Sequence, residues 1–243
     1  CSTACARPGV DPRGAALTPL LVLLLCPAVA TLLLFACPAE NKRLARLIAT
    51  LAAGVALVTA LVLFLGFTGA PDGPAVGSHV YKHVVRYDWI PSIGLSLHLG
   101  VDGMAMAMVL LTAFTIFTGV MVSYRIEKRV KEYYICLLAL VTGVFGVFVS
   151  LDLFFYYFFY ELAVIPMFLL IGIWGSDRRL YSAIKFFLYT LVGSVVMLLG
   201  ILALYFYNSG GLLGWPGLGN PATFAIEQFH KIAPQIPADL QFW

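Results

Sequence analysis

Hydrophobic residues occur in six runs, each long enough to cross a lipid bilayer as a helix. A hydrocarbon core of about 30 Å requires about 20 apolar residues in helical conformation. Short polar or basic turns separate the runs, which cover residues 17–36, 47–67, 104–124, 133–149, 153–174 and 181–207. This pattern predicts an all-α integral membrane protein with about six transmembrane helices.

The stretch 133–174 is apolar almost throughout, and at about 20 residues per span it holds two helices. Its only acids are Asp152 and Glu161. Asp152 follows Ser150 at the point where a tight turn must separate the two spans. We therefore expect Asp152 to act as a helix cap at the membrane interface.

Three segments outside the spans have different characters. Residues 1–16 are polar and irregular, and because the chain begins with Cys1, the sequence is expected to be a fragment. Residues 68–103 form a long loop, in which the alternation over 79–90 predicts a short strand or hairpin. Residues 208–243 form a glycine-rich loop and a surface tail. The mostly apolar residues 240–243 resemble the first residues of a seventh span, so the sequence is expected to be truncated before that helix.

The tail also contains apolar residues at helical spacing, although Pro234 interrupts the pattern. A short helix lying on the membrane surface would explain them. The apolar positions are Ala225, Phe229, Ile232 and Ile236.

Composition supports the membrane assignment. The chain is 61% hydrophobic and 11% charged, with a mean hydropathy of +0.94, whereas soluble proteins contain about 25% charged residues. The net charge of +3 and the absence of a basic patch with interleaved aromatics argue against nucleic acid as a partner. Nothing completes a metal site around His79 and His83, and the five cysteines contain no CxxC pair.

The distribution of lysine and arginine predicts the orientation. The turns after the first, third and fifth spans carry nine basic residues, and the opposite side carries five. Because loops rich in lysine and arginine stay in the cytoplasm, the side with nine basic residues is expected to be cytoplasmic. The N-terminus, the 68–103 loop and the tail are then expected on the outer side of the cell inner or plasma membrane, which the chain crosses several times. The nine are Lys42, Arg43, Arg46, Arg125, Lys128, Arg129, Lys131, Arg178 and Arg179; the five are Arg7, Arg13, Lys82, Arg86 and Lys231.

Glu161 is the only charged residue between positions 153 and 173. An ionised carboxylate near the bilayer centre costs at least about 2.5 to 3.5 kcal/mol, so such residues usually mark proton or ion pathways. The alternative is a neutral, hydrogen-bonded structural glutamate. Pro166 leaves the carbonyl of Leu162 without its helical donor, which suits a water-lined path, although proline is also tolerated in membrane helices for packing reasons.

Aromatic and aliphatic residues surround Glu161 at helical spacing. They are expected to disfavour the ionised carboxylate, whereas an approaching cation would favour it. A cation that approaches Glu161 would then cause proton release, and a cation that recedes would cause proton uptake. The neighbours are Phe154, Tyr157, Phe158, Ile165 and Phe168.

Lys185 lies about one and a half turns inside the last predicted span. Its side chain either extends to the lipid headgroups or takes part in a proton path. Its axial offset from Glu161 is about 12 Å by helical rise, so a direct ion pair is not expected. The charged turn before this span consists of Asp177, Arg178 and Arg179.

Several motifs together resemble the antiporter-like membrane subunit of respiratory complex I known as subunit M, or chain 4 in mitochondria. They are YDWIPSIGLSLHLGVDG, GVDGMAM, VKEYY, GVFVSLDLFFYYFFYELAVIPMFLLIGIWG and RRLYSAIKFFLYTLVGSVVMLLGILALY. The resemblance extends from about residue 17 to the end. It implies the N-terminal part of an antiporter-like, Mrp-type multi-helix bundle.

The resemblance implies a proton-pumping translocase subunit of NADH:quinone oxidoreductase. Glu161 corresponds to the helix-five acid of the family's proton channel, whose lysine partner on helix seven lies beyond this sequence. Lys185 corresponds to the lysine of the helix-six IKFF motif, and Arg178 and Arg179 to the preceding basic turn. Val141 stands where some relatives carry an acid, so a second carboxylate on that helix is absent here.

The same resemblance implies that this chain binds no redox cofactor. NADH, FMN, iron–sulfur clusters and quinone are expected in partner subunits, and neighbouring antiporter-like subunits and lipids are the expected contacts. One alternative is a subunit of a multisubunit Na+/H+ antiporter or membrane-bound hydrogenase. Absence of co-purifying flavin and iron–sulfur subunits, together with preserved antiport, would favour this alternative. An alternative of another class is a structural or assembly fragment that does not pump.

Overall fold

The computed structural model describes residues 19–38, 41–69, 72–76, 79–90, 93–210, 219–220 and 223–232. Six helices in this part are long and apolar enough to cross a membrane, as the hydrophobic pattern predicts. They are α1 (Pro19–Ala36), α2 (Lys42–Gly66), α3 (Gly103–Val122), α4 (Val130–Val149), α5 (Leu153–Trp174) and α6 (Arg179–Ser209).

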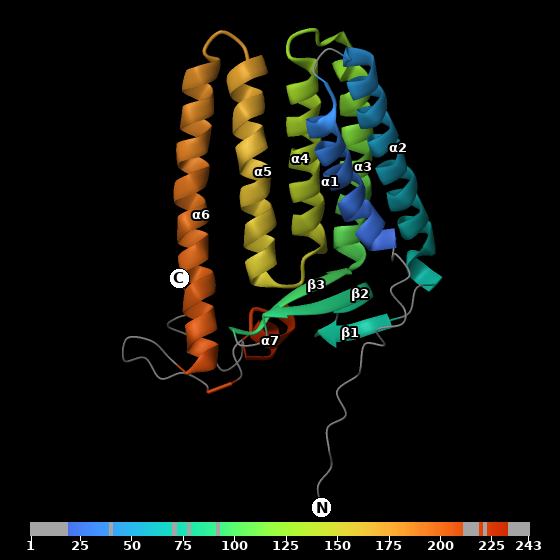
Figure 1. The fold of residues 1–243 in the computed structure, drawn as a ribbon. Coiled ribbons are helices and arrows are strands. Elements are labelled where there is room, and N and C mark those ends of the chain that lie inside the picture. Colours follow the sequence, from blue (N-terminus) through green and yellow to red (C-terminus); the bar gives the residue numbers. More distant parts are fainter. Residues whose placement is uncertain are drawn as a thin grey trace, which may run out of the picture.

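Helices α1 to α4 pack together, α5 packs against α4, and α6 packs against α5. Figure 1 shows this order, with α6 at one edge of the molecule. Half of the most apolar 18-residue window of α4 is buried, but only 11% of that of α6. Helix α4 is therefore central, and α6 has an open apolar face.

Glycines on α4 allow α5 to approach closely. A Cβ atom at Gly143 would lie 2.8 Å from Ala163 Cβ and 2.9 Å from the Phe159 carbonyl oxygen, and one at Gly146 would overlap the Phe159 ring. Small residues have this role in membrane bundles, where close packing replaces the hydrophobic effect as the main attraction between helices. The contact fixes the position of α5, which carries Glu161.

Helices α2, α4 and α6 extend beyond the hydrophobic runs that predicted them. Helix α2 begins at Lys42, α4 at Val130, and α6 runs from Arg179 to Ser209. The hydrophobic runs 47–67, 133–149 and 181–207 are shorter because they stop at charged or polar residues. A helix continues through such residues, since its backbone groups stay bonded and long basic side chains reach water.

A three-stranded antiparallel sheet lies at one end of the helices (Figure 1). Its strands are β1 (Asp72–Val76), β2 (His79–Ile90) and β3 (Leu95–Val101), in the order β1-β2-β3. The alternation over 79–90 predicted a short strand or hairpin. The structure has a strand there, β2, but it is the middle strand of a three-stranded sheet that the prediction did not include. Strand β3 is almost entirely buried, so it carries no simple alternation of polar and apolar residues.

The turn between α4 and α5 continues this sheet. Leu151 N donates to His98 O at 2.8 Å on one side, and Ile226 N donates to Leu151 O at 3.0 Å on the other. Antiparallel bridges join Leu99 with Ser150 and Asp152 with Ala225. The N-terminal end of α5 is therefore held between β3 and the segment that precedes α7 (Ile226–Ile232).

Helix α7 differs from the expected surface helix. Phe229 and Ala225 are buried, and Phe224 stacks on Tyr205 of α6 with ring centroids 4.3 Å apart. The apolar side of this short helix thus packs on the protein, because the turn before α5 and strand β1 are adjacent to it. The predicted features at 1–16, Pro234, Ile236 and 240–243 lie outside the described residues.

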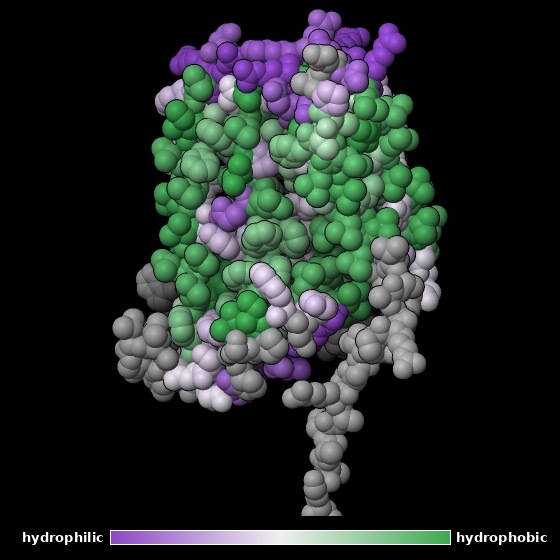
Figure 2. Space-filling model, in the orientation of Figure 1, coloured by the Kyte–Doolittle hydropathy of each residue, from purple (hydrophilic) through white to green (hydrophobic). Residues whose placement is uncertain are grey.

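The two ends of the helices differ in polarity. Figure 2 shows hydrophilic residues gathered at the end with the α3–α4 and α5–α6 loops, and a broad hydrophobic band below them. The sheet and α7 lie at the opposite end (Figure 1). This polarity matches the grouping of basic residues in the sequence.

Candidate functional site

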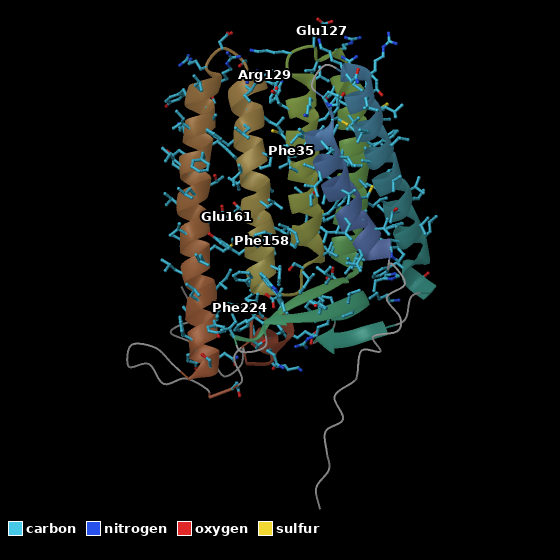
Figure 3. All side chains as sticks on the ribbon, in the orientation of Figure 1. Phe35, Glu127, Arg129, Phe158, Glu161 and Phe224 are labelled. Atoms are coloured by element: carbon cyan, nitrogen blue, oxygen red, sulfur yellow. The ribbon has the colours of Figure 1, made fainter. Side chains whose placement is uncertain are left out.

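Glu161 lies in the middle part of α5. By helical rise it is about 12 Å from the start of the helix at Leu153 and about 20 Å from its end at Trp174. Figure 3 labels it at mid-height, between α5 and α6. The carboxylate therefore lies at the depth that an acid in a membrane pathway would need.

The Glu161 carboxylate is partly enclosed by protein. Its Oε1 atom is buried and has no hydrogen-bond partner among the described residues. The Tyr157 hydroxyl, one turn earlier on α5, lies near both this carboxylate and the hydroxyl of Ser194 on α6. A buried carboxylate oxygen without a donor is costly, so this position is unusual for a residue that serves packing alone.

Ser194 is the residue of this group that the sequence did not single out. It is 2% exposed, and its hydroxyl also donates to Leu191 O at 3.0 Å. Ala183, three turns earlier, lies on the same side of α6 and contacts α5 at Gly172. A serine at the helical spacing of a close-packing alanine is the signal that could have identified it.

The apolar residues around Glu161 fall into two sets. Phe168 packs against Phe187 of α6 with ring centroids 5.2 Å apart, and Phe154 packs against Phe224 at 5.9 Å. Phe158 and Ile165 are instead 49% and 56% exposed. Phe158 and Ile165 thus lie on a face of α5 that the described helices leave open, whereas Phe154 and Phe168 pack against other aromatic rings.

Pro166 is buried inside α5, and the helix continues past it to Trp174. Since proline lacks an N–H group, the carbonyl one turn earlier, that of Leu162, has lost its usual helical donor. The free acceptor predicted beside Glu161 is therefore retained within a continuous helix.

Lys185 lies on the opposite side of α6 from the site. It is exposed, and its Nζ atom lies 5.9 Å from the ring centroids of both Tyr181 and Tyr189. It is two residues from Ala183, which faces α5, and two residues rotate the side chain by about 200°. The structure therefore does not bring Lys185 to Glu161, but places it in an open groove on the outer face of α6.

The charged turn before α6 lies at the basic end of α5. Asp177, Arg178 and Arg179 are all exposed. Arg179 Nη1 donates to the carbonyl of Ile173 at 3.2 Å, so it satisfies one acceptor at the C-terminal end of α5. The contact gives Arg179 a structural role at this helix end.

A second group of ionisable residues lies at the opposite end of α5. Asp152 caps the helix as predicted, because its Oδ1 accepts from Phe154 N at 3.0 Å and Phe155 N at 3.4 Å. The cap is also fully buried within the protein. His98 of β3, also buried, places Nε2 3.7 Å from Oε1 of Glu227 in α7.

Burial raises the pKa of Asp152 from 3.8 to about 6. The backbone amides of Phe154, Phe155 and Ser96 and the positive charge of Arg86 oppose this rise, since each favours the ionised form. The loss of hydration outweighs these contributions. Asp152 therefore binds and releases a proton closer to neutral pH than an exposed aspartate.

Metal-ligating side chains do not gather into a site in the part of the chain that the structure describes. No group of three or more histidines, cysteines, aspartates or glutamates there is arranged to hold a metal ion. Cys26, Cys37 and Cys136 are free thiols. The candidate chemistry of the described residues is proton exchange at carboxylates.

The fold and the buried glutamate define a class of membrane protein. Residues 150–230 match the family described as NADH:quinone oxidoreductase/Mrp antiporter, transmembrane. This match covers α5, Glu161 and α6. This part of the chain thus resembles the antiporter-like membrane subunits of that family.

Within the family, the chain resembles subunit M and chain 4 of NADH-quinone oxidoreductases. It is 36% identical to subunit M of Rickettsia prowazekii over 170 residues, which are 68% of this chain and 33% of that protein. It is 42% identical to subunit M of Rhodobacter capsulatus over 168 residues, or 69% and 31%. Chain 4 of Chondrus crispus is 34% identical over 190 residues, or 77% and 37%.

Solved structures show the same fold. A chain of respiratory complex I from Thermus thermophilus with bound NADH has a TM-score of 0.67 and 27% identity, covering 86% of this chain and 38% of that chain. The Mrp complex from Dietzia has a TM-score of 0.61 and 20% identity, covering 78% and 34%, which supports the fold alone. The chain thus spans about a third of the length of the relatives that it matches.

Proposed function

We propose that this chain is part of a membrane subunit that translocates protons, coupled to electron transfer from NADH to quinone. The partly enclosed Glu161 carboxylate carries this proposal, because an acid in the middle of an apolar helix is rarely retained for packing alone. The matches to subunit M support the coupling to NADH and quinone.

Glu161 exchanges the proton in this mechanism. Its carboxylate lies partly enclosed between α5 and α6, and a positive charge that approaches a carboxylate favours proton release, whereas one that recedes favours proton uptake. Tyr157 lies between the carboxylate and Ser194, so its hydroxyl can pass a proton between α5 and α6. Pro166 leaves a backbone acceptor nearby where water can bind.

The positive-inside rule gives the orientation of the chain in the membrane, and with it the side of the membrane that each end of the path faces. The basic ends of the helices are cytoplasmic, and the sheet and α7 are extracytoplasmic. The N-terminus is then outside the cell inner membrane or plasma membrane. Protons taken up from the basic end reach Glu161 and leave towards the sheet.

Redox chemistry takes place in other subunits in this proposal. NADH, FMN, iron–sulfur clusters and quinone bind there, and neighbouring antiporter-like subunits contact this chain in the membrane. Lys185, with its two tyrosines, lies on an open apolar face of α6 that suits lipid or protein contact. It belongs to the proton path only if further protein covers that face.

A second candidate is a subunit of an Mrp-type Na+/H+ antiporter or membrane-bound hydrogenase. The matching family supports this candidate, because its description names both NADH:quinone oxidoreductase and Mrp antiporter. Purification of the native complex distinguishes them: flavin and iron–sulfur subunits indicate the first, and their absence with preserved cation antiport indicates the second.

Replacement of the acid in the assembled complex tests the function. Glu161→Gln keeps the shape of the side chain and removes its exchangeable proton. The matched control is Glu127→Gln, which changes an exposed acid in the α3–α4 loop (Figure 3). NADH-driven acidification of inverted membrane vesicles is followed with a pH-sensitive dye, together with NADH oxidation.

Glu161→Gln is expected to abolish the share of pumping that depends on this subunit, whereas Glu127→Gln pumps like the wild type. Assembly is checked by native electrophoresis. An assembled Glu161→Gln complex with the wild-type ratio of protons to electrons would refute the proposal. It would favour the structural or assembly role.

A further inference from the structure

Three ionisable residues from three elements meet at the sheet end of α5. Asp152 is the N-cap of α5, His98 lies in β3, and Glu227 lies in the first turn of α7. Backbone contacts join these elements, because Leu151 N donates to His98 O and Asp152 forms a bridge with Ala225. Residues distant in sequence are thus held together by the backbone.

The side chains of His98 and Glu227 face each other across this junction, and Asp152 lies beside the same two strands. His98 Nε2 lies 3.7 Å from Glu227 Oε1, and the Asp152 carboxylate faces the amide of Ser96 and the charge of Arg86. Ser96 and His98 are two residues apart on β3, so they share a face of the strand. Arg86 lies opposite His98 in the β2–β3 register.

Several polar atoms in this group remain without a hydrogen bond. Asp152 is 0% exposed, yet its Oδ2 has no hydrogen-bond partner in the part of the chain that the structure describes. The same holds there for Glu227 Oε1, apart from its ion pair, and for the Ser96 hydroxyl. Buried oxygens without donors are costly, which indicates that the group accommodates something that supplies a donor.

A proton is the ligand that fits best. It neutralises a buried carboxylate and turns one oxygen into a donor for a neighbouring acceptor. A metal ion would be repelled by Arg86, which faces the same carboxylate. Histidine is also the side chain whose ordinary charge change falls between about pH 5 and 8.

We propose that Asp152, His98 and Glu227 form a second proton-binding site, which exchanges protons between Glu161 and the aqueous phase on the sheet side. This inference rests on the proposed function, because that function makes Glu161 the source of the protons. The raised pKa of Asp152, about 6, agrees with exchange near neutral pH.

Helix α5 links the two acids. Asp152 precedes Glu161 by nine residues, about 14 Å by helical rise, and the Tyr157 hydroxyl lies near Glu161 between them. In the net transfer, Glu161 loses one proton, and the second site gains it through Tyr157 and intervening water. Release to the aqueous phase restores the second site, and no other bond changes.

Charged groups from each adjacent element set the proton affinity of the site. Arg86 of β2 favours the ionised form of Asp152, and His98 of β3 lies within ion-pair distance of Glu227. The fourth element, α7, contributes Glu227 itself.

Asp152→Asn separates the role of this residue as a helix cap from its role in proton exchange. Asparagine is as good an N-cap as aspartate, so the bonds to Phe154 N and Phe155 N are kept while the exchangeable proton is lost. The matched control is Asp102→Asn, which replaces the capping carboxylate of α3, bonded to Ala105 N at 2.7 Å. His98→Gln is a second variant, outside any helix cap.

The first measurement is infrared titration of the complex that contains this chain, between about pH 4 and 8. The wild-type minus Asp152→Asn difference spectrum is expected to show one carboxyl band that titrates near pH 6, and His98→Gln is expected to shift its midpoint. The Asp102→Asn difference spectrum should lack a band with that midpoint. A difference spectrum for Asp152→Asn without a titrating carboxyl band would overturn the inference.

The second measurement separates this inference from the proposed function. Pumping into inverted vesicles is recorded at several internal pH values, since the vesicle interior corresponds to the sheet side. Asp152→Asn and His98→Gln are expected to lose most of the wild-type dependence on internal pH, unlike Asp102→Asn. If Glu161→Gln stops pumping but Asp152→Asn keeps the wild-type dependence, the second site is disproved and the proposed function stands.

Discussion

The buried cap of α5 leads to a quantitative prediction about stability. The pKa of Asp152 rises from 3.8 in an exposed aspartate to about 6 in the folded protein, mainly because of burial. The folded state thus binds the proton more tightly than the unfolded state. At 1.36 kcal/mol per pKa unit, the ionised side chain costs about 3 kcal/mol of folding free energy.

The sign follows from this difference in proton affinity. Below about pH 3 Asp152 is mostly protonated in both states, so nearly its full contribution to stability is present. As the pH rises through about 6, the folded state must also lose its proton, and this contribution is lost. The wild-type protein is therefore expected to lose about 3 kcal/mol relative to Asp152→Asn between about pH 3 and pH 7.

The assay is denaturant unfolding of the chain in detergent micelles over this pH range. Trp89 is a suitable fluorescent reporter, because its ring packs against Phe155 at the same end of α5, with centroids 6.0 Å apart. Asp102→Asn controls for replacement of a capping carboxylate. A difference between wild type and Asp152→Asn that stays constant within about 0.5 kcal/mol would refute the reasoning.

Two further substitutions test the packing and the proton path. Gly143→Ala places a methyl group against Ala163, so it is expected to destabilise the protein by about 1 to 3 kcal/mol in thermal unfolding, whereas Gly119→Ala, with nothing within 4 Å, should have little effect. An unchanged midpoint for Gly143→Ala would contradict the close α4–α5 contact. Tyr157→Phe removes the hydroxyl shared by the buried glutamate and α6, and is expected to slow proton pumping severalfold while electron transfer remains. Tyr160→Phe on the same helix is its control, and equal pumping rates in the two variants would exclude a role for that hydroxyl.

Many of the helical features could be predicted from the chain alone. A run of apolar residues must become a helix in a bilayer, because only a helix satisfies all backbone groups within one segment. For the same reason an acid within such a run is conspicuous, and Glu161 could be recognised without a structure. The predicted span 153–174 coincides with α5, since Asp152 and Gly175 bound it sharply.

The sequence could not show which polar residues share a site. Ser194 looks like many serines in membrane helices, and only the packing of α6 on α5 brings it to Tyr157. Lys185 shows the reverse case: its position in an apolar helix suggested a proton path, but the rotation of α6 directs it to the open face. Helical rotation depends on partner helices, which periodicity does not specify when nearly every residue is apolar.

The sequence by itself therefore determined the class of the protein, its six spans, the buried acid and the cap of α5. These properties are local, because each depends on a continuous segment and its transfer between water and lipid. The tertiary structure alone decided that β3, the α4–α5 turn and α7 join as one backbone unit, with His98 and Glu227 in contact across 129 positions of sequence. Such contacts are set by the relative placement of separate elements, and no local pattern of residues records that placement.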